Sequence, residues 1–375
     1  MKLKRLLFFL YSLFFVFTSF SICAIADESE SGMPSEYSNF LDSLPDEVID
    51  SLPGDMLSND PLSVGDGISD FSRPDNMLKL ALDGLLGGVR EIYPTLVLAI
   101  GIMIISFVAS SVTEGMGHNR LAVFISHMSL LCVILGLVYN SITLVSGYFE
   151  SLCKMAAAYL PLSAVLYSIG GNISTAASSS ATFGVCLTVC QFIFTYTAVP
   201  VFVFSLSMAV TSSFYESKTV SSISSAVKKY YTMLLSLVMS VMSVSLGAQN
   251  VISSKMDNAT MRGAKFIFSS FVPVTGGTIS SSMGAIASSV ELIRGCVGIG
   301  GIIIIFIMLA PLVCHLVGMK LFLFILEIFS DITGGGSMIS QISSLYSYLL
   351  GVALISSTVF ILSFALLASC ASAIA

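Results

Sequence analysis

The residues of this chain that could do chemistry include a few charged side chains set among apolar residues. They are Glu291, Arg294, Lys320, Glu327 and Asp331. Glu291 and Arg294 are three residues apart, so they would share one face of a helix and could pair. A charge within a membrane is costly and by default indicates a function, such as ion coupling or a polar pathway. Because each residue also lies near the end of an apolar run, the alternative is that its side chain reaches the interface.

A second set of candidates consists of prolines and glycines that interrupt apolar runs. They are Pro161, Gly170, Gly171, Pro273, Gly276, Gly277, Pro311, Gly334, Gly335 and Gly336. Irregular backbone at membrane depth is tolerated only where protein packs around it or where it lines water. Paired breaks in two halves of a chain indicate a transporter-like central site. The competing interpretation is that small residues allow close helix packing.

No motif of a known enzyme class accompanies these candidates. The sequence has no phosphate-binding Gly-x4-Gly-Lys-Ser/Thr loop, no His-Glu-x2-His and no Gly-x-Ser-x-Gly. Its three histidines are not clustered, and its eight cysteines are scattered. Cys186 and Cys190 would share a helix face, and we interpret them as packing residues. We therefore expect no catalysis, no cofactor and no metal site.

The elements that hold these residues must lie in lipid. Of 375 residues, 55% are hydrophobic and 10% are charged, whereas an average soluble domain is about 25% charged. We expect an all-α, polytopic helical bundle, because spans need about 20 mostly apolar residues. The expected spans cover residues 94–112, 121–146, 181–210, 231–248, 295–319 and 345–371, with partial segments at 155–169, 266–290 and 321–329.

The amino terminus has the three parts of a secretory signal. Lys2, Lys4 and Arg5 precede an apolar run, and Ala24 and Ala26 give the small-x-small pattern of a cleavage site. We expect cleavage after residue 26; an uncleaved anchor helix is the alternative. Cleavage would place the next segment outside the membrane.

Four regions are expected: a signal peptide at 1–26, an acidic segment at 27–75, an amphipathic interfacial helix at 76–92 and a membrane domain at 93–375. Fifteen acidic and three basic residues lie in 27–92, which argues against nucleic acid as a partner. Five prolines make 27–75 typical of a loosely ordered segment. Apolar residues at helical spacing between 40 and 52 leave open one or two short amphipathic helices.

The arrangement of these parts resembles the stage III sporulation protein AE family of endospore-forming Firmicutes. The most specific stretch is Phe271-Val272-Pro273-Val274-Thr275-Gly276-Gly277-Thr278-Ile279-Ser280. Tyr159-Leu160-Pro161 followed by Gly170-Gly171 fits as well. Thr275 and Ser281 are small departures from the pattern. The resemblance covers nearly the whole chain.

The resemblance implies a permease-like subunit of a secretion or feeding channel between mother cell and forespore. It implies a location in the mother-cell membrane around the forespore. The implied partners are other membrane proteins of the same sporulation operon, a separate ATPase and a forespore membrane protein. The alternative function is a stand-alone secondary transporter, for which Glu291 and Glu327 would be the coupling carboxylates.

Overall fold

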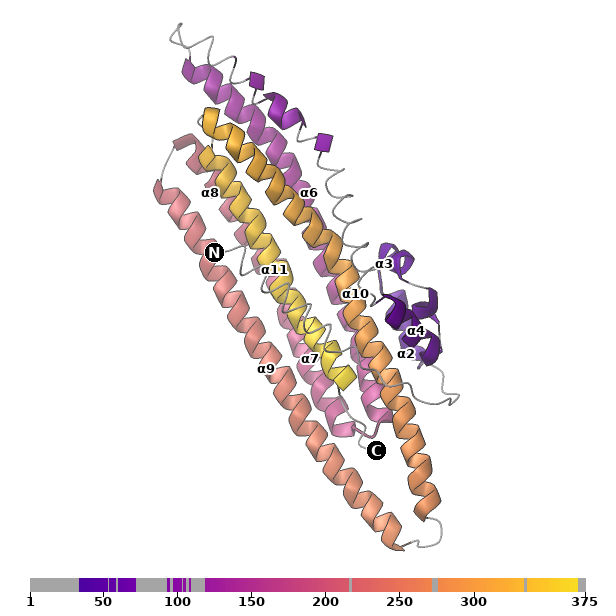
Figure 1. Cartoon of the computed structure of the whole chain (residues 1–375). Helices are drawn as coiled ribbons and strands as arrows, with labels where there is room; N and C mark the ends of the chain where they lie inside the picture. Colours follow the sequence, from indigo (N-terminus) through magenta and orange to yellow (C-terminus); the bar gives the residue numbers. More distant parts are fainter. Residues whose placement is uncertain are drawn as a thin grey trace.

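The computed structural model of the chain consists of long helices. It describes residues 34–71 apart from 53 and 59, parts of 93–108, and residues 119–215, 218–271, 276–333 and 336–369. The long helices are α6 (Asn119–Ile169), α7 (Ile173–Ile193), α8 (Val199–Tyr215), α9 (Lys218–Phe271), α10 (Gly276–Thr333) and α11 (Gly336–Ser369). They run side by side along the molecule, and no described residue lies in a strand (Figure 1).

Five of these helical stretches are long and apolar enough to cross a membrane, which confirms the polytopic all-α fold. They are Leu131–Ile169, Ile173–Thr211, Val220–Thr260, Ser288–Ile328 and Ile339–Ser369. The expected first span at 94–112 is described only in part, and its described residues are helical. The expected signal cleavage site at Ala24 and Ala26 lies outside the described residues.

The expected spans and partial segments merge into fewer and longer helices. Segments 121–146 and 155–169 both belong to α6, which continues through Pro161. Segments 295–319 and 321–329 both belong to α10, which continues through Pro311. The prediction of a break is therefore wrong at these two prolines. A proline removes one backbone hydrogen bond and its ring crowds the carbonyl four residues earlier, but the packing of a long helix against its neighbours holds the turns on both sides.

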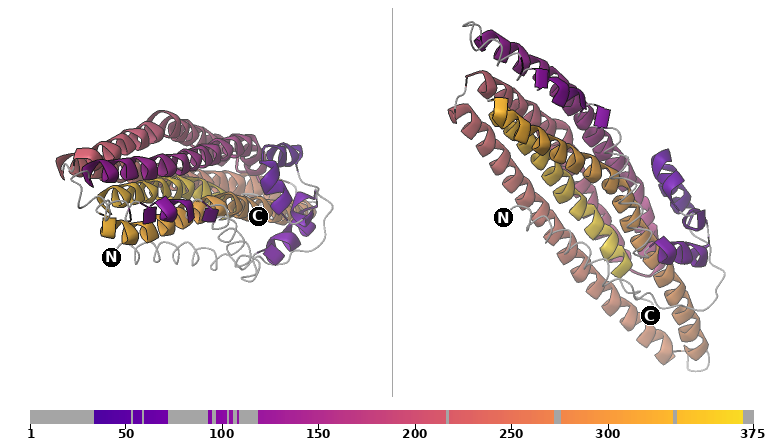
Figure 2. Two further views of the ribbon diagram at one scale, coloured as in Figure 1. Left: turned by 90° about the horizontal axis from the view of Figure 1, so that it is seen from above. Right: turned by 45° about the horizontal axis from the view of Figure 1, so that its top comes forward.

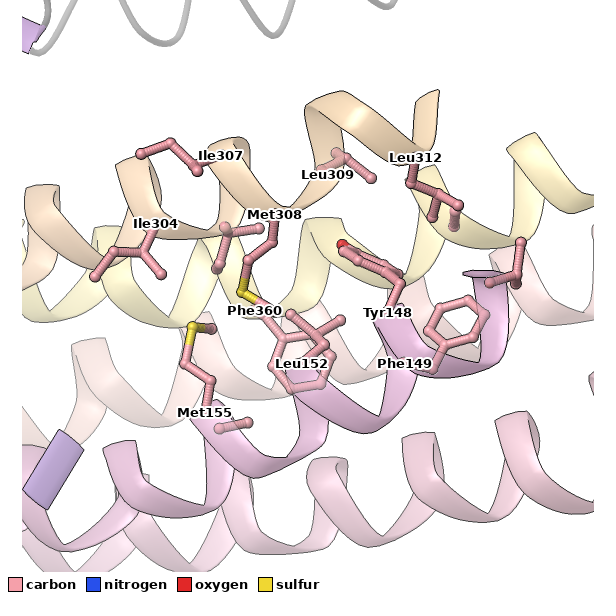
Figure 3. Packing of buried hydrophobic residues seen from close by; sticks show 14 of the residues in the cluster. Tyr148, Phe149, Leu152, Met155, Ile304, Ile307, Met308, Leu309, Leu312 and Phe360 are labelled. Carbon is pink, nitrogen blue, oxygen red and sulfur yellow. The ribbon is translucent and has the colours of Figure 1, made fainter. Parts of the chain in front are cut away.

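The helices form antiparallel hairpins around an apolar core. The hydroxyl of Thr175 on α7 donates to Asp257 on α9 near one end of the bundle, and Ser224 of α9 donates to the Ser205 carbonyl of α8 near the other. Between α7 and α8 lies η2 (Phe194–Ala198), a single π-helical turn. Figure 3 shows Leu152 and Met155 of α6 facing α10 and Phe360 of α11 in the core.

Two glycines set the distance between α10 and α11. A Cβ atom at Gly301 would lie 2.1 Å from Cδ1 and Cε1 of Phe364. At Gly298 it would lie 2.6 Å from the Cβ of Ala368. Neither position has room for a methyl group, so the small residues here act as packing residues.

Residues 34–71 are helical rather than loosely ordered, and they pack on the side of the bundle. They form α2 (Ser35–Asp42), α3 (Asp46–Ser51), the 3-10 turn η1 (Gly54–Leu57) and α4 (Pro61–Phe71), which lie beside α10 (Figures 1 and 2). Their apolar side chains recur at helical spacing and point inward. Because the bundle supplies the apolar surface that the segment alone lacks, burial offsets the entropy that its composition would otherwise favour.

The contacts of this amino-terminal segment are specific. The ring of Phe40 lies 6.0 Å from that of Phe364 on α11. The hydroxyl of Tyr37 donates to the Met56 carbonyl at 2.8 Å. Burial, with a smaller contribution from the nearby thiol of Cys296, raises the pKa of the Tyr37 phenol above its usual range, so the group stays a donor.

Candidate functional site

The turn between α6 and α7 is the structured form of the predicted Gly170–Gly171 break. Gly171 has φ 75°, the left-handed conformation that favours glycine. Its N–H donates to the Ser168 carbonyl at 3.0 Å, and the N–H of Asn172 donates to the Tyr167 carbonyl at 2.9 Å. These two bonds form a Schellman motif, which satisfies the last carbonyls of α6. The break is therefore an ordered turn that is held by backbone hydrogen bonds.

Replacing Gly171 by alanine should destabilise this turn. A side chain in the left-handed conformation costs about 1–2 kcal/mol, and asparagine tolerates it better. We expect Gly171→Ala to lower the unfolding temperature of the detergent-purified protein and Gly171→Asn to lower it less. Equal effects of the two substitutions would contradict the backbone explanation.

The amino terminus of α7 is capped by a carboxylate from another helix. Asp257 of α9 accepts hydrogen bonds from the Ser174 N–H at 3.0 Å, the Thr175 N–H at 2.8 Å and the Thr175 hydroxyl at 2.7 Å. A helix usually obtains this bond from its own N-cap side chain, but Asn172 makes no such bond here. The negative charge also complements the helix dipole. Asp257 thus ties α7 to α9.

A buried guanidinium lies at the other side of the same turn. Arg294 of α10 is completely buried. A Cβ atom at Gly170 would lie 2.7 Å from its Nη2 and 3.0 Å from its Cζ. The missing side chain at Gly170 leaves the space that the guanidinium fills, next to the carboxyl end of α6, where a cation is favourable. Arg294 and Asp257 hold the two helix ends that meet at this turn.

Polar contacts continue from the turn along α7 and α9. The hydroxyls of Ser178 and Ser253 lie 2.7 Å apart, and Thr182 contacts Gln249. The amide of Asn250 donates to the Tyr167 hydroxyl at 3.2 Å. We call this set together with Asp257 the polar seam. Farther along, sulfur atoms replace oxygens: Cys190 Sγ lies 3.9 Å from Met239 Sδ.

The bundle is longer than a bilayer is thick. The span Leu131–Ile169 has 39 residues, which is about 58 Å of helix against about 30 Å of hydrocarbon. The segment α2–α4 exposes Asp42, Asp46, Asp50, Asp55, Asp60 and Asp66, so it must lie in water. It packs against the bundle near Cys296 and Phe364. We infer that the turn and the polar seam lie on this watery side.

We infer that the hydrocarbon layer surrounds the next part of the bundle. On α9 the large exposed side chains at this level are the apolar residues Leu234, Leu237, Val241 and Val244, and Ser236 and Ser240 are exposed between them. Cys190 on α7 lies at the level of Met239, in the middle of this stretch. Side chains that are exposed at the level of Cys190 are therefore at membrane depth.

An ion pair lies at this depth on α6. Lys154 Nζ is 2.8 Å from Glu150 Oε1, and the two side chains are 65% and 68% exposed. They line a pocket of about 640 Å³ with Gln191 of α7 and Thr195 of η2. A charge at the centre of a membrane helix costs about 2.5–3.5 kcal/mol on insertion scales. A π-helical turn beside such a pocket is a frequent mark of a functional site.

A buried Ser–His–Tyr group joins three helices. Ser141 Oγ lies 3.1 Å from His315 Nε2, 3.2 Å from the Tyr346 hydroxyl and 3.0 Å from the Leu137 carbonyl. One hydroxyl proton serves one acceptor at a time, and the backbone carbonyl of Leu137 competes for it. All three side chains are buried. The group ties α6, α10 and α11 together.

The predicted site residues do not converge on one point. Gly170, Gly171 and Arg294 meet at the turn, whereas Arg294 and Lys320 lie about 39 Å apart along α10. Glu291 is exposed, and Lys320 and Glu327 are partly buried. Gly276 and Gly277 begin α10, Gly336 begins α11, and Asp331 lies in α10. Pro273, Gly334 and Gly335 lie outside the described residues.

Sequence reasoning missed Asp257, Glu150 and Lys154. Glu150 and Lys154 fall between the expected segments 121–146 and 155–169, which the structure joins into the single helix α6. Their spacing of four residues was the available signal. Asp257 falls between the expected segments 231–248 and 266–290, and its serine, asparagine and threonine neighbours give no indication of a helix partner.

The fold and its spans define a multi-pass membrane protein. A family model described as stage III sporulation protein AE matches residues 65–372. The chain therefore belongs to the stage III sporulation protein AE family and is a sporulation membrane protein, as the sequence resemblance predicted. No curated protein and no solved structure gives a match.

Proposed function

We propose that this protein is a permease-like transmembrane subunit of a multiprotein secretion or feeding channel between mother cell and forespore. It lies in the mother-cell membrane around the forespore and is required for late forespore development. Its partners are other membrane proteins of the same operon, a separate ATPase that supplies energy and a forespore membrane protein. It carries out no catalysis of its own.

The observation that carries this proposal is the docked segment α2–α4. Apolar side chains of this segment, such as Phe40 and Met56, are buried. Its carboxylates stay exposed, so the side of the membrane domain that faces water presents an acidic surface. Such a surface supports association with other proteins through charge complementarity. If the amino terminus is exported, this surface faces the space between the two membranes.

A stand-alone secondary transporter is less well supported. Of its candidate coupling carboxylates, Glu291 is exposed and Glu327 is only partly buried. The buried carboxylate of Asp257 is occupied by three donors of α7. A carboxylate held in this way acts as a helix cap, and its release for ion coupling would free the end of α7.

Deleting the gene in its endospore-forming host tests the proposal. We expect engulfed forespores in which a late forespore reporter stays at background, and wild-type protein supplied from the mother cell should restore it. A tagged copy should copurify in mild detergent with the other membrane products of the operon. Normal spore yield in the deletion strain, or a tagged protein that purifies alone from sporulating cells, would contradict the proposal.

A further inference from the structure

We propose that the groove between α6 and α7 around Glu150 and Lys154 faces water and forms a wall of the transport pathway. The permeant class is hydrated polar solutes. The term pathway depends on the channel function proposed above, whereas contact of the groove with water does not.

The first argument is the contrast between two faces of the bundle at one level. On α9 the large exposed side chains are Leu234, Leu237, Val241 and Val244, which suit lipid. The small hydroxyl side chains of Ser236 and Ser240 are exposed between them, but no charged residue is. On α6 the exposed side chains are Glu150 and Lys154, paired at 2.8 Å. Two charged groups on the outer surface at membrane depth are compatible with water or protein but not with acyl chains.

The second argument is the length of the polar stripe. Small or polar residues are exposed on α6 at alternating spacings of three and four: Asn140, Thr143, Gly147, Glu150, Lys154 and Ala157. This spacing keeps them on one face of the helix. Its polar members run from 140 to 154, which is about 21 Å of helix against a hydrocarbon layer of about 30 Å. Asn140 and Thr143 therefore extend the polar face beyond the ion pair.

The third argument is the hollow beside the stripe. The pocket of about 640 Å³ extends across to Gln191 and Thr195, so both of its walls carry polar groups. The π-helical turn η2 contributes Thr195 and Phe194 to the far wall. A hollow with polar groups on both sides has room and partners for several water molecules.

The charges of the groove indicate what could pass. Glu150 and Lys154 neutralise each other, so the wall carries no field of one sign. A pathway selective for cations or anions carries rings of one charge. The groove therefore suits neutral, zwitterionic or mixed polar solutes rather than ions of one sign.

Cys153 is a natural reporter, because it lines the pocket beside Lys154. Thiols react as thiolates, which form in water and not in lipid. Membranes from sporulating cells would be treated with a charged, membrane-impermeant methanethiosulfonate, and labelled cysteines located by mass spectrometry. Thr195→Cys adds a second wall position. Leu237→Cys and Val241→Cys on α9 are the matched lipid-facing controls, and every variant must first support normal spore yield.

We expect Cys153 and Thr195→Cys to be labelled at least about tenfold faster than the α9 controls. Labelling of wall and control positions at the same slow rate would overturn the proposal, since the groove would then be dry. Crosslinking of Cys153 or Thr195→Cys to a neighbouring chain without labelling would also overturn it, by showing a protein interface. Either result leaves the channel function intact, because that depends on the reporter and copurification experiments.

Discussion

The substitution Gly301→Ala is expected to separate α10 from α11 and to cause a large loss of stability. The new Cβ would lie 2.1 Å from the ring of Phe364. That ring is completely buried and lies 4.2 Å from the ring of Tyr159, so it cannot turn aside. Overpacking of a core costs about 1–3 kcal/mol, and we expect the upper end. Thermal unfolding in detergent measures the loss.

Gly184→Ala is the matched control. A Cβ atom there would meet nothing within 4 Å, so a substitution inside α7 should gain about 0.5–1 kcal/mol from helix propensity. Phe364→Leu, which makes the facing side chain smaller, should recover part of the loss in the double variant with Gly301→Ala. Additive effects of Gly301→Ala and Phe364→Leu would contradict the proposed contact.

The second large effect is expected for Asp257→Ala. Loss of the carboxylate would leave the backbone N–H groups of Ser174 and Thr175 without their acceptor. One buried and one partly buried donor left without an acceptor, together with the lost charged hydrogen bond, should cost about 3 kcal/mol. The first turn of α7 should fray, so hydrogen exchange at residues 173–176 should become faster while exchange in α11 changes little.

Two further variants separate this cap from other effects. Thr175→Val removes only the side-chain donor and should cost about 1 kcal/mol. Lys255→Ala changes an exposed charge on the same helix and should have almost no effect. Unchanged exchange at the start of α7 in Asp257→Ala would show that the helix is held by other contacts.

The residues of the turn illustrate how far the sequence reaches. Gly170 and Gly171 identified a break in the helix, because glycine is the residue that the left-handed conformation requires. Their neighbours could not reveal that Asp257 and Arg294 would hold the two helix ends. Those partners come from α9 and α10, and no local pattern encodes which helix packs on which.

The prolines show the opposite error. Pro161 and Pro311 predicted interruptions from local chemistry, but α6 and α10 continue through them. Local propensity loses here because contacts along the rest of each helix outweigh one missing hydrogen bond. Because the expected segments 121–146 and 155–169 form the single helix α6, Glu150 and Lys154 lie on the surface of a span and not in a connection between two spans.

The sequence by itself determined that this protein lies in lipid, that it is a multi-pass helical membrane protein, and to which family it belongs. Those depend on composition and on apolar runs, which each residue contributes independently of its neighbours in space. The tertiary structure alone decided that α2–α4 packs on the bundle, that Asp257 caps α7 and that Glu150 and Lys154 open onto a groove. Each of these depends on the register between antiparallel helices. That register is set by residues such as Gly301 and Phe364, which are distant in the chain and close together only in the fold.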